Sequence, residues 1–330
     1  MPGMGSNAIL SICRQNSMGA TAPSSWWAIP FANNGLAFTY GELTDDSIQQ
    51  TPDLPDRAIG IGGFQGNIEF NLFPLPVGFF LRGLFGSNYS VSAIGSGFTH
   101  VFNPATAAFD AGCSLPPYAF QVDPGEPSVN SAYVHTDGFI NTGEISIAAA
   151  GYARASFGVM GKSIGLITKA PGASINQTGA APLLWSGASI SFGGTAVQRF
   201  SNVKLAFDNK IAAQDRITGV KQHTFFFRDG FRDFGRFSGT IDLAQTDWLD
   251  FFNGTEKRMV INMLGVTSIS SGVNEFMTID IPRMIYTAYP LNVSGAGIVT
   301  AAVEGRAMYS AASKTVCTIT LVNTFASYAA

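Results

Sequence analysis

Short segments rich in Ile, Val, Phe, Thr and Tyr recur along the chain, separated by Gly, Asn, Asp and Pro. This pattern is typical of β-strands bounded by turns. The segments that it predicts as strands are 66–72, 143–149, 188–192, 203–207, 223–227, 237–243, 259–263, 276–281, 298–303 and 316–322. Amphipathic helical periodicity is rare by comparison, so the sequence predicts an all-β fold.

Two short helices are expected between the strands. The apolar stretch 77–84 is followed by Gly86, and the stretch 247–252 is preceded by Thr246 and followed by Gly254. Thr is a favoured N-cap residue and Gly a favoured residue just past a helix C-terminus. Each stretch has room for only two or three helical turns.

One strand pattern occurs twice, about half the chain apart. FQGNIEF at 64–70 matches FSGTIDL at 237–243, and each copy precedes one of the two helices. Further on, 139–143 before a strand rich in Ile and Ala resembles 290–295 before the strand 298–303. The recurring order of strand, helix and strand favours a duplication over chance similarity among Gly- and Phe-rich strands. A stretch rich in Gly, Pro and Ala at 169–182 then divides the chain into domains 1–175, with an N-terminal arm, and 176–330.

The repeated strand has one apolar and one polar face, because alternate residues of a strand point to opposite sides. The apolar positions are Phe64, Ile68 and Phe70 in the first copy and Phe237, Ile241 and Leu243 in the second. The polar positions are Gln65, Asn67 and Glu69, and Ser238, Thr240 and Asp242. Such a polar face either meets bulk solvent or lines a channel, and the alternation alone favours solvent.

The composition excludes several classes of protein. Charged residues are 12% of the 330 residues, against about 25% in ordinary globular chains. Hydrophobic residues reach 46%, with 27 Phe and 37 Gly, which excludes intrinsic disorder. The 19 basic residues are scattered and the net charge is −3, so no basic stripe for nucleic acid exists. So little charge indicates a surface largely covered by other copies of the chain.

The first 17 residues do not resemble a secretory signal peptide. The longest apolar region, 72–85, contains Pro74, Pro76 and Arg82 and is shorter than the roughly 20 residues of a membrane helix. Cysteines at 13, 113 and 317 are odd in number and widely spaced, which suits free, buried thiols in a reducing compartment. We therefore expect intracellular synthesis without signal-peptide export, and no membrane partner.

Motifs for chemistry are mostly missing from the sequence. His100, His135 and His223 are too far apart for a metal-binding motif. The Gly-Lys-Ser at 161–163 resembles the end of a phosphate-binding loop, but Ser156 stands where that loop needs Gly. The Gly-rich run 60–66 leads into a strand, unlike a dinucleotide-binding loop, and no nucleophile elbow occurs. We predict no catalytic residue, no metal and no cofactor, and hence no enzyme.

The ordered pattern of segments resembles the major tail tube proteins of long-tailed, siphovirus-like bacteriophages, in particular the long forms with an internally duplicated tube domain. The resemblance covers about residues 20–326 and rests on strand and turn patterns. The segments that carry it are DLPDR at 53–57 before GFQGNIE at 63–69, NVKLAFDNK at 202–210, RFSGTID at 236–242 and VCTITLVN at 316–323.

The resemblance implies antiparallel β-sandwich or barrel-forming domains, each with a short flanking helix. Single-domain members form hexameric rings, so three duplicated chains would form a pseudo-hexamer. The rings stack into a hollow tube in the virion, which holds a tape-measure protein and passes double-stranded DNA during ejection. Tail terminator and distal tail proteins would be further partners.

Two sets of residues are then candidates for a role in the tube. The lumen wall should avoid unpaired Lys and Arg, which would bind phosphate. Its candidates are the six polar positions of the repeated strand, with Glu144 and Ser146 on the strand 143–149. Ring stacking could use unlike charges, which set register between partners. Its candidates are acidic Glu42, Asp45, Asp46, Asp53 and Asp56 and basic Lys221, Arg228, Arg232 and Arg236.

Two other readings remain open. An outer-membrane β-barrel also has Gly, aromatic residues and alternating strands, although the sequence has few ten-residue alternating segments and no signal peptide. Another virion protein, such as a head or decoration protein, is the second alternative.

Overall fold

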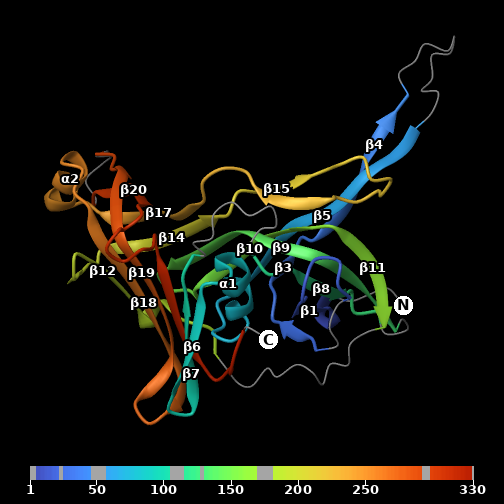
Figure 1. The fold of residues 1–330 in the computed structure, drawn as a ribbon. Helices are drawn as coiled ribbons and strands as arrows, with labels where there is room; N and C mark the ends of the chain where they lie inside the picture. The colour runs from blue at the N-terminus through green and yellow to red at the C-terminus, as the bar shows by residue number, and fades with distance from the viewer. Residues whose placement is uncertain are drawn as a thin grey trace.

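The structure is a computed structural model that describes residues 5–21, 25–45, 57–104, 115–126, 130–168, 181–291 and 298–328. Antiparallel strands form most of it, with two short α-helices (Figure 1). This architecture confirms the predicted all-β fold.

Eleven strands lie in the first half of the chain: β1 (Ile9–Arg14), β2 (Trp27–Ile29), β3 (Asn33–Asn34), β4 (Ala37–Thr44), β5 (Arg57–Asn71), β6 (Tyr89–Ile94), β7 (Gly97–Phe102), β8 (Tyr118–Asp123), β9 (Ser131–Ala148), β10 (Arg154–Gly161) and β11 (Ser163–Thr168). The second half contains β12 (Ala188–Phe192), β13 (Thr195–Ala196), β14 (Phe200–Asp208), β15 (Ile211–Gln214), β16 (Phe225–Arg228), β17 (Asp233–Asp242), β18 (Lys257–Ser270), β19 (Val273–Ala288), β20 (Thr300–Ala307) and β21 (Thr318–Asn323). Short 3-10 turns are η1 (Gly5–Asn7) and η3 (Trp185–Gly187).

The helices follow the two copies of the repeated strand, as predicted. α1 (Val77–Phe85) is buried along its whole length and ends at Gly86, whose φ of 84° is in the left-handed region that favours glycine. α2 (Gln245–Phe252) begins earlier than expected, so the prediction of Thr246 as its N-cap is wrong. Ala244 holds that position without a side-chain hydrogen bond, because the helix starts almost directly after β17 ends.

The two halves of the chain repeat one strand order. Neighbouring strands in the first half run β2-β1-β8-β9-β10-β5-β4. In the second half they run β13-β12-β18-β19-β20-β17-β14. Every one of these pairs is antiparallel, and the strands correspond one to one in chain order. β11 pairs with β9 as β21 pairs with β19, which extends the correspondence by one more strand.

The long strands β9 and β19 each connect two layers. The first part of β9 pairs with β8 and β11, and the rest pairs with β10. In the same way, β19 pairs first with β18 and β21 and later with β20. Each half therefore folds back on itself, and α1 and α2 pack on β9 and β19, respectively.

Two features connect the halves. β14 of the second half pairs with β9 of the first, which makes one sheet of both. The β6–β7 hairpin, which comes from the first half, pairs with β21 at the end of the second. The apolar core runs through both halves without a break.

Candidate functional site

One sheet face runs through both halves of the chain. Successive pairings give the strand order β4-β5-β10-β9-β14-β17-β20-β19. Across it, a row of mutually opposite residues consists of Glu69, Ser156, Glu144, Ala206, Arg236 and Arg306. Residues directly opposite one another in paired strands share a face. The row therefore places both halves of the chain on one polar surface.

The alternation predicted for the repeated strand is present in both copies. Phe64, Ile68, Phe70, Phe237 and Ile241 are buried, and Leu243, just past β17, is packed against the core. Gln65, Asn67 and Glu69 are exposed, whereas Ser238, Thr240 and Asp242 are half-buried.

Strand register brings the remaining lumen candidates to the same surface. Glu144 is in the row of Glu69, and Ser146 is two residues further along β9. Lys204 lies opposite Ser146 on one side and Ser238 on the other. All eight candidates thus lie on the surface that we call the polar face, defined by the exposed sides of β5, β10, β9, β14, β17 and β20.

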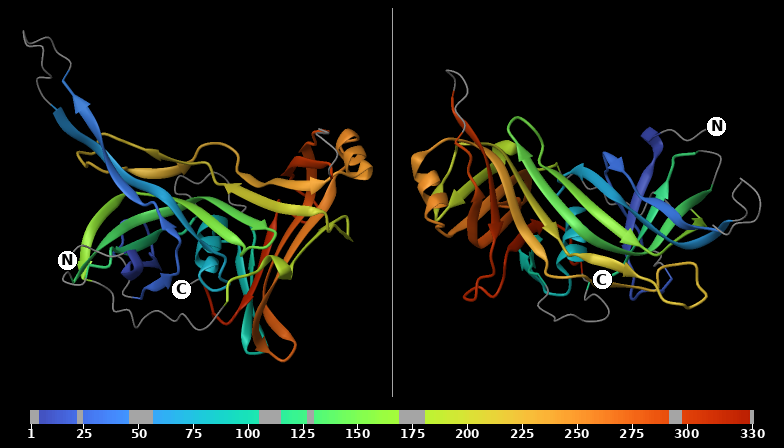
Figure 2. Two further views of the ribbon diagram at one scale, coloured as in Figure 1. Left: turned by 180° about the vertical axis from the view of Figure 1, so that it is seen from behind. Right: turned by 90° about the horizontal axis from the view of Figure 1, so that it is seen from above.

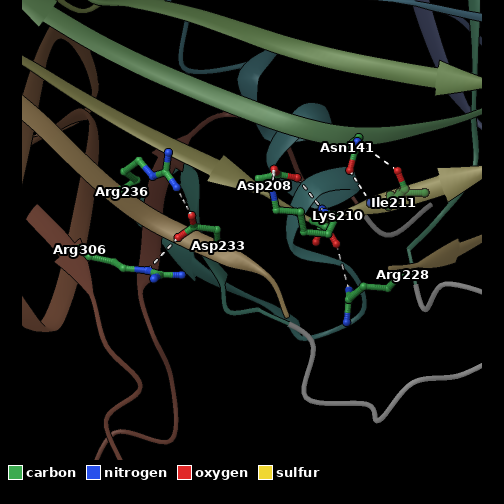
Figure 3. Close-up of polar contacts among 9 residues, drawn as sticks. Asn141, Asp208, Lys210, Ile211, Arg228, Asp233, Arg236 and Arg306 are labelled. Atoms are coloured by element: carbon green, nitrogen blue, oxygen red, sulfur yellow. Dashed lines mark hydrogen bonds and ion pairs between the residues drawn. The ribbon is translucent and has the colours of Figure 1, made fainter. Parts of the chain in front are cut away.

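The polar face also carries basic residues that are not among the lumen candidates. Lys204 pairs with Glu144 across the β9–β14 junction at 2.8 Å. Asp233 accepts a hydrogen bond from Arg236 at 2.6 Å and forms an ion pair with Arg306 at 3.2 Å (Figure 3). Each of these cations is held by a carboxylate on its own or a neighbouring strand. Arg154 of β10, opposite Ser146, is exposed on the same face. The face is therefore charged, with Lys204, Arg236 and Arg306 paired to carboxylates.

A shallow polar groove follows the junction of the two halves on this face. Its lining includes Asn67, Glu144, Lys210 and Arg236. Lys210 pairs with Asp208 at 2.5 Å, and the Arg228 Nε donates to the backbone oxygen of Asn209 (Figure 3). The groove is open and lined by ion pairs, without the buried apolar walls of a small-molecule site.

The β15–β16 ribbon covers one end of the polar face. Ile211 and Phe226 from the ribbon pack against Phe139 and Met160, which point out of β9 and β10. Figure 1 shows the ribbon crossing this end of the sheet, on the side away from α1. The uncovered part of the face is therefore centred on the β9–β14 junction.

The ring-stacking candidates that the structure describes lie on several separate elements. Glu42 pairs with Arg57 on the β4–β5 arm, and Asp45 is at the end of β4. Asp46, Asp53 and Asp56 lie outside the described residues.

The basic members of that set are spread over several elements. Lys221 lies beside β5, where its backbone oxygen accepts from the Gly62 N–H. The Arg232 guanidinium stacks on the Phe234 ring, and burial lowers its pKa to about 10. Arg236 belongs to the polar face, next to Ser238.

The buried histidines and thiols that the structure describes lie in the core. His100 bonds Tyr89 and Asn323, and burial lowers the pKa of His135 to about 4. Cys13 and Cys317 are buried free thiols, and Cys113 lies outside the described residues. Within the described ranges, no cluster of three His, Cys, Asp or Glu could hold a metal ion. None of the described helices has the length and apolarity to cross a membrane.

Comparison with known protein families gives a match over most of the chain. A family model for phage tail tube proteins matches residues 5–307, which is nearly the whole chain. No curated protein matches the chain.

Proposed function

The chain belongs to the phage tail tube protein family, and from this we propose that three copies close into a ring and that such rings stack into a hollow tube for the genome. The protein is a structural component of the virion tail. The observation that supports the ring and tube best is the continuous sheet through both halves, with one packed face and one polar face. Among the described residues, β4 pairs only with β5 and so forms an edge of this sheet.

The repeated strand order supports an internal duplication. Eight strands in each half correspond in both chain order and spatial order, with a helix after β5 and after β17. We propose that residues 1–175 and 176–330 each supply one tube unit. Three chains would then fill the six positions of a pseudo-hexameric ring.

The ends of the joined sheet support assembly through copies of the same chain. β4 ends the sheet with exposed Tyr40 and Leu43, and Ile59 is exposed beside it on β5. An exposed strand edge with apolar side chains invites pairing with another chain. Glu42 is the one charged residue within β4. Because the two ends of the sheet differ, contacts between copies are head-to-tail, and these close into a ring when the rotation permits.

We propose that the polar face lines the tube. Lys and Arg on a channel wall bind phosphate by releasing counterions, which would slow DNA. Lys204, Arg236 and Arg306 are engaged by Glu144 and Asp233, which compete with phosphate for them. Glu69 and Asp242 would add acidic groups that repel DNA over about 8–10 Å at physiological salt.

The β4–β5 arm is the proposed site of stacking between rings. It projects beyond the sandwich, with the β15–β16 ribbon at its base (Figures 1 and 2). Its end carries Glu42, Arg57 and Asp45, so contacts with the next ring would depend on salt. The tape-measure, terminator and distal tail proteins remain the other proposed partners, with DNA passing only transiently.

Purified protein tests the proposal directly. Native mass spectrometry should find a species of three chains of 34.9 kDa each, and electron microscopy should show rings or tubes with a central hole. A protein that remains monomeric at all concentrations and salt conditions would contradict the proposal.

A further inference from the structure

The two helices occupy corresponding places but differ in burial. α1 follows β5 and packs on β9, and α2 follows β17 and packs on β19. Every residue of α1 is buried, whereas α2 contains no buried residue. Phe85, the last residue of α1, is 1% exposed, and Phe252, the last residue of α2, is 70% exposed.

α1 owes part of its burial to the other half of the chain. The Phe85 ring lies 5.8 Å from the Phe207 ring of β14 and 5.3 Å from the Phe234 ring of β17. Asn209, just after β14, donates from Nδ2 to the Leu84 backbone oxygen at 2.8 Å. The end of α1 is thus covered by the strand that extends the sheet past β9.

The strand that corresponds to β14 is β4, the free edge of the first half. Lys204 of β14 is opposite Ser238, and Ala37 of β4 is opposite Gln65, the residue that matches Ser238 in the repeat. Ala37 therefore corresponds to Lys204. Three residues further along each strand, Tyr40 corresponds to Phe207. Tyr40 is 56% exposed, whereas Phe207 is 1% exposed.

We propose that α2 and β4 form the contact between chains, with Phe252 of one copy packing against Tyr40 of a second copy as Phe85 packs against Phe207 within the chain. The inference rests on the proposed ring and names its lateral interface. Leu249 of α2, 41% exposed, lies on the helical turn before Phe252 and would be covered with it.

A single chain cannot make this contact. α2 and β4 lie at opposite ends of the molecule in Figure 1 and in both views of Figure 2. Only another copy can bring a β4 edge beside α2. The same contact, repeated from copy to copy, leaves neither apolar surface exposed in a closed ring.

Chemical cross-linking tests the contact. Tyr40→Cys and Phe252→Cys are combined in one chain with Cys113→Ser, and a short bismaleimide is added to the assembled protein. We expect covalent dimers and trimers under reducing electrophoresis. The matched control combines Tyr40→Cys with Val266→Cys, a residue 66% exposed on β18, and should cross-link at least fivefold less.

A second variant covers the case in which the cysteines disturb assembly. Because Phe252 is exposed in the single chain, Phe252→Ser should leave its circular dichroism and unfolding unchanged. It should raise the concentration needed for ring formation about tenfold or more, since it removes an aromatic side chain from the interface. Phe252→Leu should restore much of the assembly.

The outcomes separate this inference from the proposed function. Wild-type rings with no cross-link above the control and normal assembly of Phe252→Ser would overturn the α2–β4 contact and leave the ring standing. A wild-type protein without rings or tubes would overturn both.

Discussion

Asn209 is fully buried where the two halves of the chain meet. Its amide donates to the backbone oxygens of Leu84 at 2.8 Å and Ile140 at 3.3 Å, so one side chain connects α1 and β9 to the end of β14. A buried carbonyl group that loses its donor costs about 1–3 kcal/mol.

Asn209→Ala should therefore lower the free energy of unfolding by about 1–3 kcal/mol, measured by urea titration of the monomeric chain. The matched control is Asn202→Ala on β14, where the amide is exposed and donates to Thr240. That change should stay within about 0.5 kcal/mol. Equal effects of the two substitutions would contradict the structural role of Asn209.

Glu275 is a buried carboxyl on β19, and burial raises its pKa to about 6 from an ordinary value of 4.5. The folded state thus favours the neutral form. Its contribution to stability is complete below about pH 4.5 and is lost as the pH rises through 6. A shift of this size corresponds to about 2 kcal/mol at neutral pH.

Glu275→Gln should stabilise the protein relative to wild type by about 2 kcal/mol more at pH 7.5 than at pH 4.5. Urea unfolding at the two pH values measures this difference. Glu304→Gln, on β20, serves as the control and should show little change. A Glu275→Gln effect that is constant with pH would exclude a raised pKa.

At the scale of single residues, the sequence predicted which side chains of the repeated strand face the core. Alternation within one strand is a local property, so Phe64 and Phe237 could be assigned without knowing their neighbours. The same alternation places Arg236, two residues before Ser238, on the polar face. Lys204 could not be placed there, because its position depends on the register of β14 with β9 and β17.

At the scale of elements, we predict that added positive charge on the polar face makes the tube retain DNA. Glu69→Lys combined with Asp242→Lys should leave tube assembly intact, because neither side chain is packed in the core. The tubes should bind short duplex DNA strongly at low salt and release it at higher salt, and phage carrying them should eject DNA poorly.

Tubes carrying Ser90→Lys and Ser92→Lys are the control for this experiment. These residues are exposed on β6, in the other layer of the structure, and should not retain DNA. Strong DNA retention in the control alone, or in neither variant, would argue against the polar face as the lumen wall.

The β4–β5 arm makes a separate prediction. Asp45→Lys combined with Asp46→Lys should slow the growth of tubes from rings while leaving the rings folded, because stacking relies on complementary charge. Light scattering over a range of salt concentrations follows the growth. Unchanged kinetics at every salt concentration would remove these charges from the stacking contact.

Each of the ten segments predicted as strands overlaps a strand, but they account for only ten of the 21 strands that the structure describes. The longest strands were also underestimated. β5 extends back to Arg57 through Gly60, Gly62 and Gly63, residues that usually end a strand, because β4 pairs with it there. The prediction of Thr246 as the N-cap of α2 was wrong for a similar reason. β17 ends at Asp242, and its end determines where α2 begins. Tertiary pairing decided both boundaries.

At the scale of the whole molecule, the sequence predicted two related halves but not how they connect. Its match of 139–143 with 290–295 was wrong, because the strand order makes β9 correspond to β19 and not to β20. The pairing of β14 with β9 and of β7 with β21 joins segments far apart in sequence. Such pairings depend on global topology, which local patterns do not encode. The proposed α2–β4 contact between chains is inferred by analogy with this internal junction.

A cryo-EM reconstruction of the assembled tube tests the central claim most directly. It should show three chains per ring, with each chain filling two similar positions and with Glu69, Glu144 and Asp242 facing the lumen. Six chains per ring with one tube position each, or these side chains on the outer surface, would contradict the account.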